Sequence, residues 1–578
     1  MTNYKETLNL PKTGFEMRAG LAQKEPKMLE AWDERDLYGE IQKAREGAPL
    51  FVMHDGPPYA NGHLHHGHIL NKILKDIVVK DRTMRGFRTG FIPGWDCHGL
   101  PIEVQVDKEL GKKKADMSKA EVRQACRAYA ERFVGIQRDE FRRLGILARW
   151  SEPYLTMAFG YEATILRELA KFVGTGLLYK GLRPVNWCCV HQTALAEAEV
   201  EYEDLTSPSI YVALPLTSLP PGIDGIVAAA DLVIWTTTPW TLPANLAVSA
   251  HPGFDYIAYQ AKGRTRILAR GLAESFLDAI GEPAFDESKV LGQWKGEELA
   301  GLTYRHPLFD RTSPVLLGLH VTLESGTGLV HTAPGHGPDD FEIGRRNDLE
   351  ILSPVDDRGV FTDEAGPFAG KHVFKANAEI IKALVDAGAL LNAPDDTVVH
   401  RYAHCWRCHK PIIMRATEQW FVALDEPFNG GATLRQRALE TLGTVGWIPP
   451  WGEDRIRGML EARPDWCLSR QRTWGVPIAV VYCEKCQTPV LDQKVMERVA
   501  DVFEKEGADV WFTRSVTELT GGLTCAECGG TRFRKEEDIV DVWFESGVSY
   551  AAVIEREALG HTEGPPVDLY LEGSDQHR

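Results

Sequence analysis

The chain has 578 residues, a formal net charge of −17 at pH 7 and 44% hydrophobic residues. A single core rarely grows beyond ~300 residues, so we expect about two to four globular domains. No apolar run reaches the ~18 residues of a membrane span, and the first residues contain no apolar signal-peptide segment, which predicts a cytoplasmic protein. The acidic total does not exclude RNA, because a local basic face is sufficient.

The first predicted unit is a strand, a glycine-bearing loop and a helix, an order typical of nucleotide-binding α/β domains. Residues 49–53, PLFVM, predict a short apolar strand, and residues 67–86 predict a helix that Gly86 ends. One face of this helix carries the apolar positions Ile69, Leu70, Ile73, Leu74, Ile77 and Val78.

The loop of this unit, HDGPPYANGHLHHGH from His54 to His68, contains five histidines. His65 and His68 lie three apart at the predicted helix start, and Gly67 allows a ligand to approach the backbone. A helix N-terminus attracts anions, so the pattern favours a polyphosphate site. A metal site, with Asp55 as the only nearby carboxylate, and a purely structural loop are the alternatives.

Further elements follow along the chain. Residues 89–106, TGFIPGWDCHGLPIEVQV, predict a strand and a turn, and residues 117–141 predict a long helix with a Ser118–Glu121 capping box. From about residue 208 short β-rich runs predict a mainly β domain inserted into the α/β chain. Helical patterns return after residue 400, and the final DLYLEGSDQHR resembles a strand that runs into a site loop.

Several of the 11 cysteines are paired at metal-ligand spacing. Two Cys-x-x-Cys pairs, CEKC and CAEC, predict a closed and therefore structural zinc site of four thiolates. Its expected ligands are Cys483, Cys486, Cys525 and Cys528.

A second zinc site is less regular. CWRC supplies Cys405 and Cys408, and NWCCVHQTA supplies Cys188 and His191 at the same spacing. If these four residues combine, the zinc joins segments on both sides of the β insertion. The same NWCCVHQTA segment also offers Cys189, whereas Cys97, Cys126 and Cys467 are interpreted as buried thiols.

The motif HHGH, residues 65–68, resembles the His-x-Gly-His signature of class I aminoacyl-tRNA synthetases. Other segments resemble the isoleucyl branch of that family, in family order and over nearly the whole chain. They are HDGPPYANG, NKILKD, PGWDCHGLPIE, ALAEAEVEY, WTTTPWTLPAN, GTGLVHTAPGHGPDDF, SRQRTWGVPI, DVWFESG and YLEGSDQHR. His66 stands where the family usually has an aliphatic residue, and His191 where it usually has cysteine.

The resemblance implies a synthetic site. His65 and His68 would bind the ATP phosphates and stabilise the adenylation transition state, and Gly67 would make room for adenine. Pro57 and Trp543 would line the amino-acid pocket, and Asp96 would hold the substrate ammonium. The expected adenylate contacts are Glu572, Gly573, Asp575 and Gln576.

The β insertion would be an editing domain that hydrolyses valyl-tRNA. Isoleucine and valine differ by one methylene, which a pocket discriminates by only about 1–3 kcal/mol, the isoleucyl branch of the family being the standard example. Asp340 would hold the misacylated amino group, and His331 and the threonines would position the ester and water. The threonines are Thr236, Thr237, Thr238 and Thr241.

The implied activity is ATP-dependent attachment of isoleucine to its cognate tRNA through isoleucyl-adenylate, by a monomer that uses Mg²⁺ with ATP. The alternatives are a stand-alone hydrolase of misacylated tRNA, a non-catalytic RNA-binding zinc protein, or a valyl or leucyl enzyme. The family's Lys-Met-Ser-Lys-Ser loop is not found, since DMSKA at 116–120 lies too early. We therefore expect the amino-terminal portion of such an enzyme, without that loop and without the anticodon-binding domain.

The implied fold is α/β: a Rossmann-like parallel-sheet catalytic domain interrupted by a mainly β editing domain, with small zinc modules. The expected parts are an N-terminal arm (1–45), the first half of the catalytic domain (46–199), the editing domain (200–397), the catalytic return with a connective region (398–480), a zinc-ribbon module (481–532) and the second catalytic half (533–578).

Overall fold

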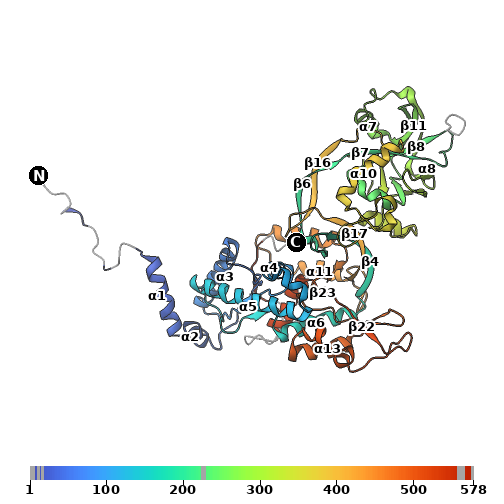
Figure 1. The fold of residues 1–578 in the computed structure, drawn as a ribbon. Coiled ribbons are helices and arrows are strands. Elements are labelled where there is room, and N and C mark those ends of the chain that lie inside the picture. The colour runs from blue at the N-terminus through green and yellow to red at the C-terminus, as the bar shows by residue number, and fades with distance from the viewer. Residues whose placement is uncertain (1–6, 10–13, 15–18, 223–228, 556–566, 574–578) are drawn as a thin grey trace.

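The computed structural model describes residues 7–9, 14, 19–222, 229–555 and 567–573, and the chain is a mixed α/β protein. Figure 1 shows a β-rich module at one end, joined by the strands β6 and β16 to a larger body that contains most of the helices. None of the helices in the described ranges has the length and apolarity that a membrane span requires.

Short parallel strands organise the centre of the body. β1 (Met53–His54) pairs with β24 (Leu569–Tyr570), and β2 (Gly94–Trp95) pairs with β3 (Tyr154–Leu155), both in parallel. The strand predicted over 49–53 is therefore shorter than expected, and only an isolated bridge between Leu50 and Arg88 extends it. The β1–β24 pairing brings two loops together that are about 500 residues apart in sequence.

The helix predicted after the histidine loop is α3 (His66–Met84), and it ends before Gly86, whose φ is 101°. Its burial differs from the simple amphipathic pattern. Leu70, Leu74 and Ile77 are exposed. The buried positions are Lys72, Lys75, Asp76 and Val79. The helix thus buries two ammonium groups because carboxylates are present to pair with them, as described below.

One local prediction was wrong. Residues 100–106, expected to belong to a strand and a turn, lie in α4 (Leu100–Leu110). Pro101 stands in the first turn of this helix, where the missing N–H is not needed. The long helix predicted over 117–141 is α5 (Lys119–Arg143), and its capping box between Ser118 and Glu121 is confirmed.

Two sheets build the β-rich module. The strand order is β12-β10-β11-β8-β7 in one and β13-β14-β9-β15 in the other. The strands are β7 (Ile210–Pro215), β8 (Ala230–Thr236), β9 (Ala247–Ala250), β10 (Asp255–Ala261), β11 (Arg264–Ala269), β12 (Val290–Lys295), β13 (Thr303–Arg305), β14 (Thr312–Leu317) and β15 (Leu329–Thr332). One buried apolar cluster contains residues of both sheets and of α10 (Val373–Asp386), among them Ile234, Val248 and Ile380. Short strands after residue 208 were predicted and are present.

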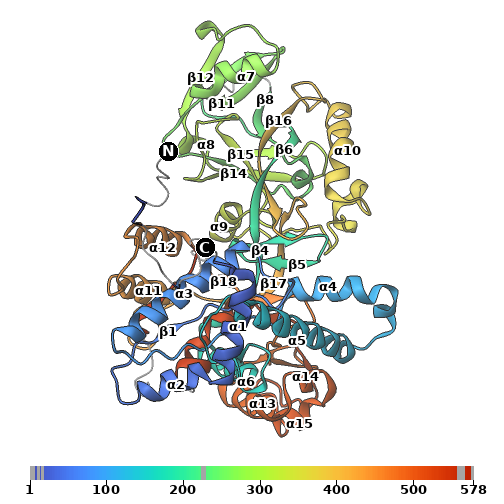
Figure 2. The ribbon, with the colours of Figure 1, turned by 90° about the vertical axis from the view of Figure 1, so that its left-hand side faces the viewer.

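The connection between module and body is a two-stranded antiparallel ribbon, which we call the neck. It consists of β6 (Val200–Pro208) and β16 (Thr397–Cys405), paired from Val200–Cys405 at one end to Pro208–Thr397 at the other. Figures 1 and 2 show the neck rising from the body beside β4 (Leu178–Cys188) and β17 (Ile413–Val422). The neck ends at the body with the pair Val200–Cys405. These two residues pack with Cys188, which belongs to the predicted second zinc site.

Candidate active site and metal centres

His65 and His68 lie side by side at the start of α3. His65 is the N-cap, and its Nδ1 accepts a hydrogen bond from the Gly67 backbone N–H at 3.1 Å. The two imidazole rings are stacked, with centroids 3.7 Å apart. Burial lowers the pKa of His68 to about 4, and nearby His65 and Lys72 act in the same direction, so His68 is neutral at pH 7. Its Nδ1 has no hydrogen-bond partner among the described residues.

A buried charge network that we did not predict from the sequence lies under this helix. Lys75 Nζ is 2.7 Å from Asp55 Oδ1 and 2.6 Å from Glu572 Oε1. Lys72 also pairs with Asp55. Burial alone would raise the pKa of the Asp55 carboxyl, but the two ammonium groups more than offset it and hold that pKa below its usual range. The NKILKD motif was the available signal, although its partners cannot be read from it.

Asp96 is a buried carboxyl group that forms no close ion pair among the described residues, although nearby His98 acts to lower its pKa. It follows β2, and its backbone is bonded to the histidine loop at both sides: Asp96 N–H donates to Pro58 O, and Ala60 N–H donates to Asp96 O. Its Oδ1 has no hydrogen-bond partner among the described residues. Burial and then the charge of Glu545 raise the pKa of Asp96 well above its usual range. A bound cation would stabilise the ionised form of this group.

The helix that carries Trp543, α16 (Val542–Gly547), is fixed against the turn after Asp96. A Cβ at Gly99 would lie 2.5 Å from Val542 Cγ2, so only glycine allows this approach. Glu545 Oε2 lies 2.7 Å from His98 Nδ1. Trp543 is half-buried on this helix, and Pro57 is half-buried in the loop that runs beside Asp96.

The cap of α16 is held by a buried arginine. Asp541 accepts a hydrogen bond from the Trp543 backbone N–H at 3.3 Å. Arg470 Nη2 lies 2.9 Å from Asp541 Oδ2 and 3.5 Å from Glu199 Oε2, and all three side chains are buried or nearly so. Arg470 therefore compensates two carboxylates and fixes the start of the Trp543 helix.

The loop after β24 approaches the histidine loop through Glu572. The Gly56 backbone N–H donates to Glu572 Oε1 at 2.9 Å, and Asn71 Nδ2 donates to Glu572 Oε2 at 3.0 Å. Gly573 follows and is exposed. The two further predicted adenylate contacts, Asp575 and Gln576, lie outside the described residues.

In the β-rich module the predicted threonines gather at the end of β8. Thr236 and Thr238 hydroxyls lie 3.2 Å apart, and Thr241 Oγ1 lies 2.8 Å from His331 Nε2. Thr237 is half-buried, and it lines a cavity of about 750 Å³ with Thr238. This cavity lies between the threonine loop, α10 and the neck strand β6.

Asp340 lies in the first turn of α9 (Pro338–Arg346), and its Oδ2 accepts a hydrogen bond from the Ala333 backbone N–H at 3.0 Å. Burial raises the pKa of Asp340 to about 7. His336, from the same loop, donates its Nδ1–H to Met414 O at 2.8 Å, because a carbonyl oxygen can only accept. Its buried Nε2 has no partner among the described residues.

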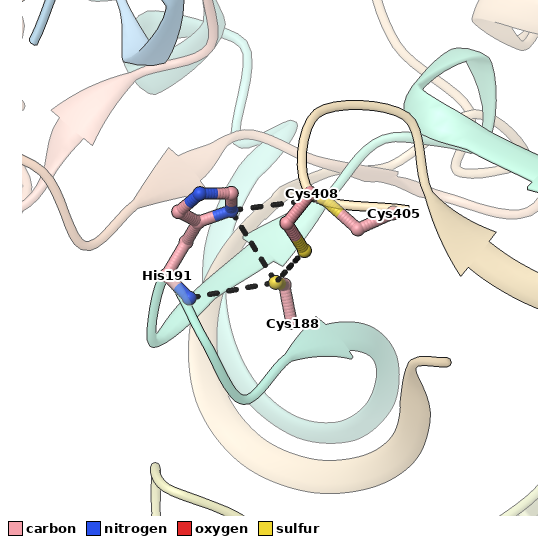
Figure 3. A group of neighbouring side chains, drawn as sticks. All are labelled: Cys188, His191, Cys405 and Cys408. Atoms are coloured by element: carbon pink, nitrogen blue, oxygen red, sulfur yellow. Dashed lines mark hydrogen bonds between the residues drawn. The ribbon is translucent and has the colours of Figure 1, made fainter. Parts of the chain in front are cut away.

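The irregular cluster at the base of the neck contains the four predicted side chains (Figure 3). Cys188 Sγ lies 3.7 Å from Cys408 Sγ and 3.4 Å from His191 Nδ1, and Cys405 Sγ lies 3.6 Å from His191 Nδ1. Ligands about 2.3 Å from a tetrahedral zinc are about 3.8 Å from one another, so this geometry can hold zinc.

The second cluster lies beside the short strands β20 (Val481–Cys483) and β22 (Phe533–Lys535). Cys483 Sγ lies 3.5 Å from Cys528 Sγ, and Cys486 Sγ lies 3.6 Å from Cys525 Sγ. The four sulfur atoms lie within 4.8 Å of one another. Both cysteine clusters could therefore bind zinc.

Residues 27–578 match the family described as tRNA synthetases class I (I, L, M and V). The chain belongs to this family. It is 52% identical to the isoleucine--tRNA ligase of Geobacter sulfurreducens, which it matches over 100% of its own length and 61% of the relative's. The isoleucine--tRNA ligase of Persephonella marina is also 52% identical, with 100% and 60% covered. The chain thus spans about 61% of the length of such relatives.

A solved ternary complex of Agrobacterium radiobacter K84 agnB2 LeuRS with tRNA and LeuAMS is 15% identical to the chain. The structural match covers 96% of this chain and 62% of the LeuRS chain, with a TM-score of 0.40.

Proposed function

We propose that the chain carries the aminoacyl-adenylate site and the editing site of an isoleucyl-tRNA synthetase. The names of its 52% identical relatives support isoleucine, rather than valine or leucine, as the substrate. The observation that carries the proposal is the contact of the His65–His68 helix with the Glu572 loop, together with buried Asp96, whose Oδ1 has no hydrogen-bond partner among the described residues. That combination suits a ligand with phosphate at one end and ammonium at the other.

In the proposed reaction the isoleucine carboxylate attacks the α-phosphorus of ATP, the bond to the bridging oxygen of the β-phosphate breaks, and pyrophosphate leaves. No protein nucleophile is needed, so the protein contributes positioning and charge stabilisation. Neutral His68, His65 and the first-turn N–H groups of α3 would donate hydrogen bonds to the phosphates. Mg²⁺ bound with ATP supplies further positive charge.

The remaining synthetic-site roles stay predictions. Asp96 would be ionised by the substrate ammonium that it holds, because the pair removes the cost of burying either charge alone. Pro57 and Trp543 would line the side-chain pocket. Gly67 would make room for adenine, with adenylate contacts from the loop of Glu572, Gly573, Asp575 and Gln576.

The domain boundaries given from the sequence are also part of the proposal. The parallel pairs β1–β24 and β2–β3 support a Rossmann-like catalytic domain, and the neck supports an inserted module between residues 200 and 397. The cavity beside Thr237 and Thr238 supports an editing role for that module, since it has room for an aminoacyl ester. Asp340 and His331 are not among the residues that line this cavity, so the contact of the valyl amino group with Asp340 stays a prediction from the sequence. A monomeric state and a cytoplasmic location remain predictions.

Both cysteine clusters would hold structural zinc. The sulfur and nitrogen separations fit the edges of a zinc tetrahedron, and four protein ligands leave no open coordination position. The ion in the cluster of Cys188, His191, Cys405 and Cys408 would fix the two neck strands to the body. It would therefore set the orientation of the module relative to the synthetic site.

Calorimetric titration of the chain with sulfamoyl-adenosine analogues of isoleucyl-, valyl- and leucyl-adenylate tests the proposal. The isoleucyl analogue should bind most tightly. Equal affinity for the three analogues would contradict the isoleucine assignment, and no binding of any would contradict the synthetic site. Separately, hydrolysis of pre-made valyl-tRNA at low salt tests the editing site. Absence of hydrolysis would contradict the proposed editing role of the module.

A further inference from the structure

We propose that Lys75 is a positioning residue that holds together the two loops of the adenylate site. The inference rests on the proposed function and deepens it, because it assigns a role to a buried group that the reaction itself does not use. The loops are the one after β1, which contains Asp55 and Gly56, and the one after β24, which contains Glu572.

The Lys75 ammonium is completely buried and bridges the two loops directly. Its Nζ lies 2.7 Å from Asp55 Oδ1 and 2.6 Å from Glu572 Oε1. The two carboxylates belong to residues more than 500 positions apart, and α3 supplies the cation between them. The same helix begins at the His65–His68 pair, so a single rigid element connects the phosphate end of the site to both loops.

The charge of the network is balanced. Asp55 also pairs with Lys72, so two ammonium groups face two carboxylates in the buried region. The second oxygen of Asp55 accepts the Gly94 backbone N–H at 3.0 Å, two residues before Asp96. Displacement of Asp55 would therefore be transmitted to the strand that precedes the ammonium-binding carboxylate. Buried charges without partners are strongly unfavourable, so each member depends on the others.

Glu572 is fully engaged by this arrangement. Its Oε1 accepts from Lys75 and from the Gly56 backbone N–H, and its Oε2 accepts from Asn71 Nδ2. A Cβ at position 56 would lie 2.2 Å from Glu572 Oε1, so glycine is required for this contact. The carboxylate is thus occupied within the protein. We infer that Glu572 shapes the site by fixing the backbone of its loop and not through a free carboxylate offered to substrate.

The experiment compares K75M and K75R with the matched control K80M in the full 578-residue chain. Lys80 lies on the same helix and pairs with Asp76 at 2.5 Å, but this pair does not join the two loops. The affinity for the isoleucyl sulfamoyl-adenosine analogue is measured by calorimetry, with zinc content and valyl-tRNA hydrolysis as measures of an intact fold. We expect K75M to weaken binding by roughly 10- to 100-fold, the range seen when groups that orient metal ligands are removed. K75R, which keeps the charge, should lose less, and K80M should bind like the unmodified chain.

Analogue affinity of K75M within about twofold of the unmodified chain would overturn the proposal, because a purely structural lysine changes stability without changing the site. If K75M does not fold, E572Q tests the proposal instead. This change removes the negative charge of Glu572 and leaves the pairs of Asp55 with Lys72 and Lys75 in place. Weaker analogue binding by E572Q supports the bridge, and unchanged binding overturns it. Failure of the unmodified chain to bind any analogue would instead overturn the proposed function, and this inference with it.

Discussion

Replacing Asp340 by Asn should slow valyl-tRNA hydrolysis without disturbing the module. Asn keeps the shape of the side chain and can still accept the Ala333 N–H, which Asp340 Oδ2 now accepts at 3.0 Å. It loses the charge that would hold the substrate ammonium. A hydrogen bond to a charged group contributes about 1.5–3 kcal/mol, so the rate should fall by roughly 10- to 150-fold.

The assay is deacylation of pre-made valyl-tRNA, with Asp339→Asn as the matched control because Asp339 is adjacent but exposed. Burial raises the pKa of Asp340 to about 7, so its ionised fraction should fall from about one half at pH 7 to about one tenth at pH 6. The unmodified chain should therefore slow as the pH falls through this range, and Asp340→Asn should lack that dependence. His331 does not titrate there, because burial lowers its pKa to about 4.

Hydrolysis of valyl-tRNA by Asp340→Asn at the unmodified rate would contradict a role for the Asp340 charge in holding the substrate ammonium. A flat rate between pH 5.5 and 7 in the unmodified chain would contradict only the raised pKa of Asp340. Asp340→Asn and Asp339→Asn should both keep the unmodified affinity for the isoleucyl-adenylate analogue, because both residues lie in the module beyond the neck. Loss of that affinity would show that Asp340 acts in the synthetic site.

Three other outcomes are expected. Elemental analysis should find two zinc ions per chain and one after Cys405→Ser; a single zinc that this change leaves in place would exclude the neck site. Arg470→Met should lower the free energy of unfolding in urea by about 3–5 kcal/mol, because it leaves Asp541 buried and unpaired, and adding Asp541→Asn should restore part of it. Burial lowers the pKa of His98, but the carboxylates of Glu545 and Glu162 raise it to about 9. Relative to ~6.5 in the unfolded chain, this stabilisation is complete below pH 6.5 and is lost as the pH rises through 9, by about 3 kcal/mol. His98→Gln should remove that loss, and an identical pH dependence of unfolding in both proteins would contradict it.

Local patterns predicted the elements whose signals are themselves local. The capping box at Ser118 and Glu121 marked the start of α5, and Gly86 marked the end of α3. Residues 100–106 were misread because Ile102, Val104 and Val106 alternate with polar residues as in a strand. These residues are helical, because Pro101 suits the first turn of a helix and the helix continues to Leu110.

The buried side of α3 could not be predicted from its own sequence. Periodicity identified an apolar face, but Leu70 and Leu74 are exposed and Lys72 and Lys75 are buried. The reason is tertiary: Asp55 and Glu572 lie in loops that follow two strands which pair only in the folded chain, and Glu572 is 497 residues from Lys75. Charge burial of this kind depends on partners that no window of local sequence contains.

The most direct test of the account is a crystal structure of the chain with the isoleucyl sulfamoyl-adenosine analogue. The analogue's sulfamoyl group, which stands in for the α-phosphate, should lie at the His65–His68 start of α3, and its ammonium should lie within hydrogen-bond distance of Asp96 Oδ1. The isoleucine side chain should point toward Trp543. An analogue bound elsewhere, or bound with its ammonium away from Asp96, would contradict the proposed synthetic site.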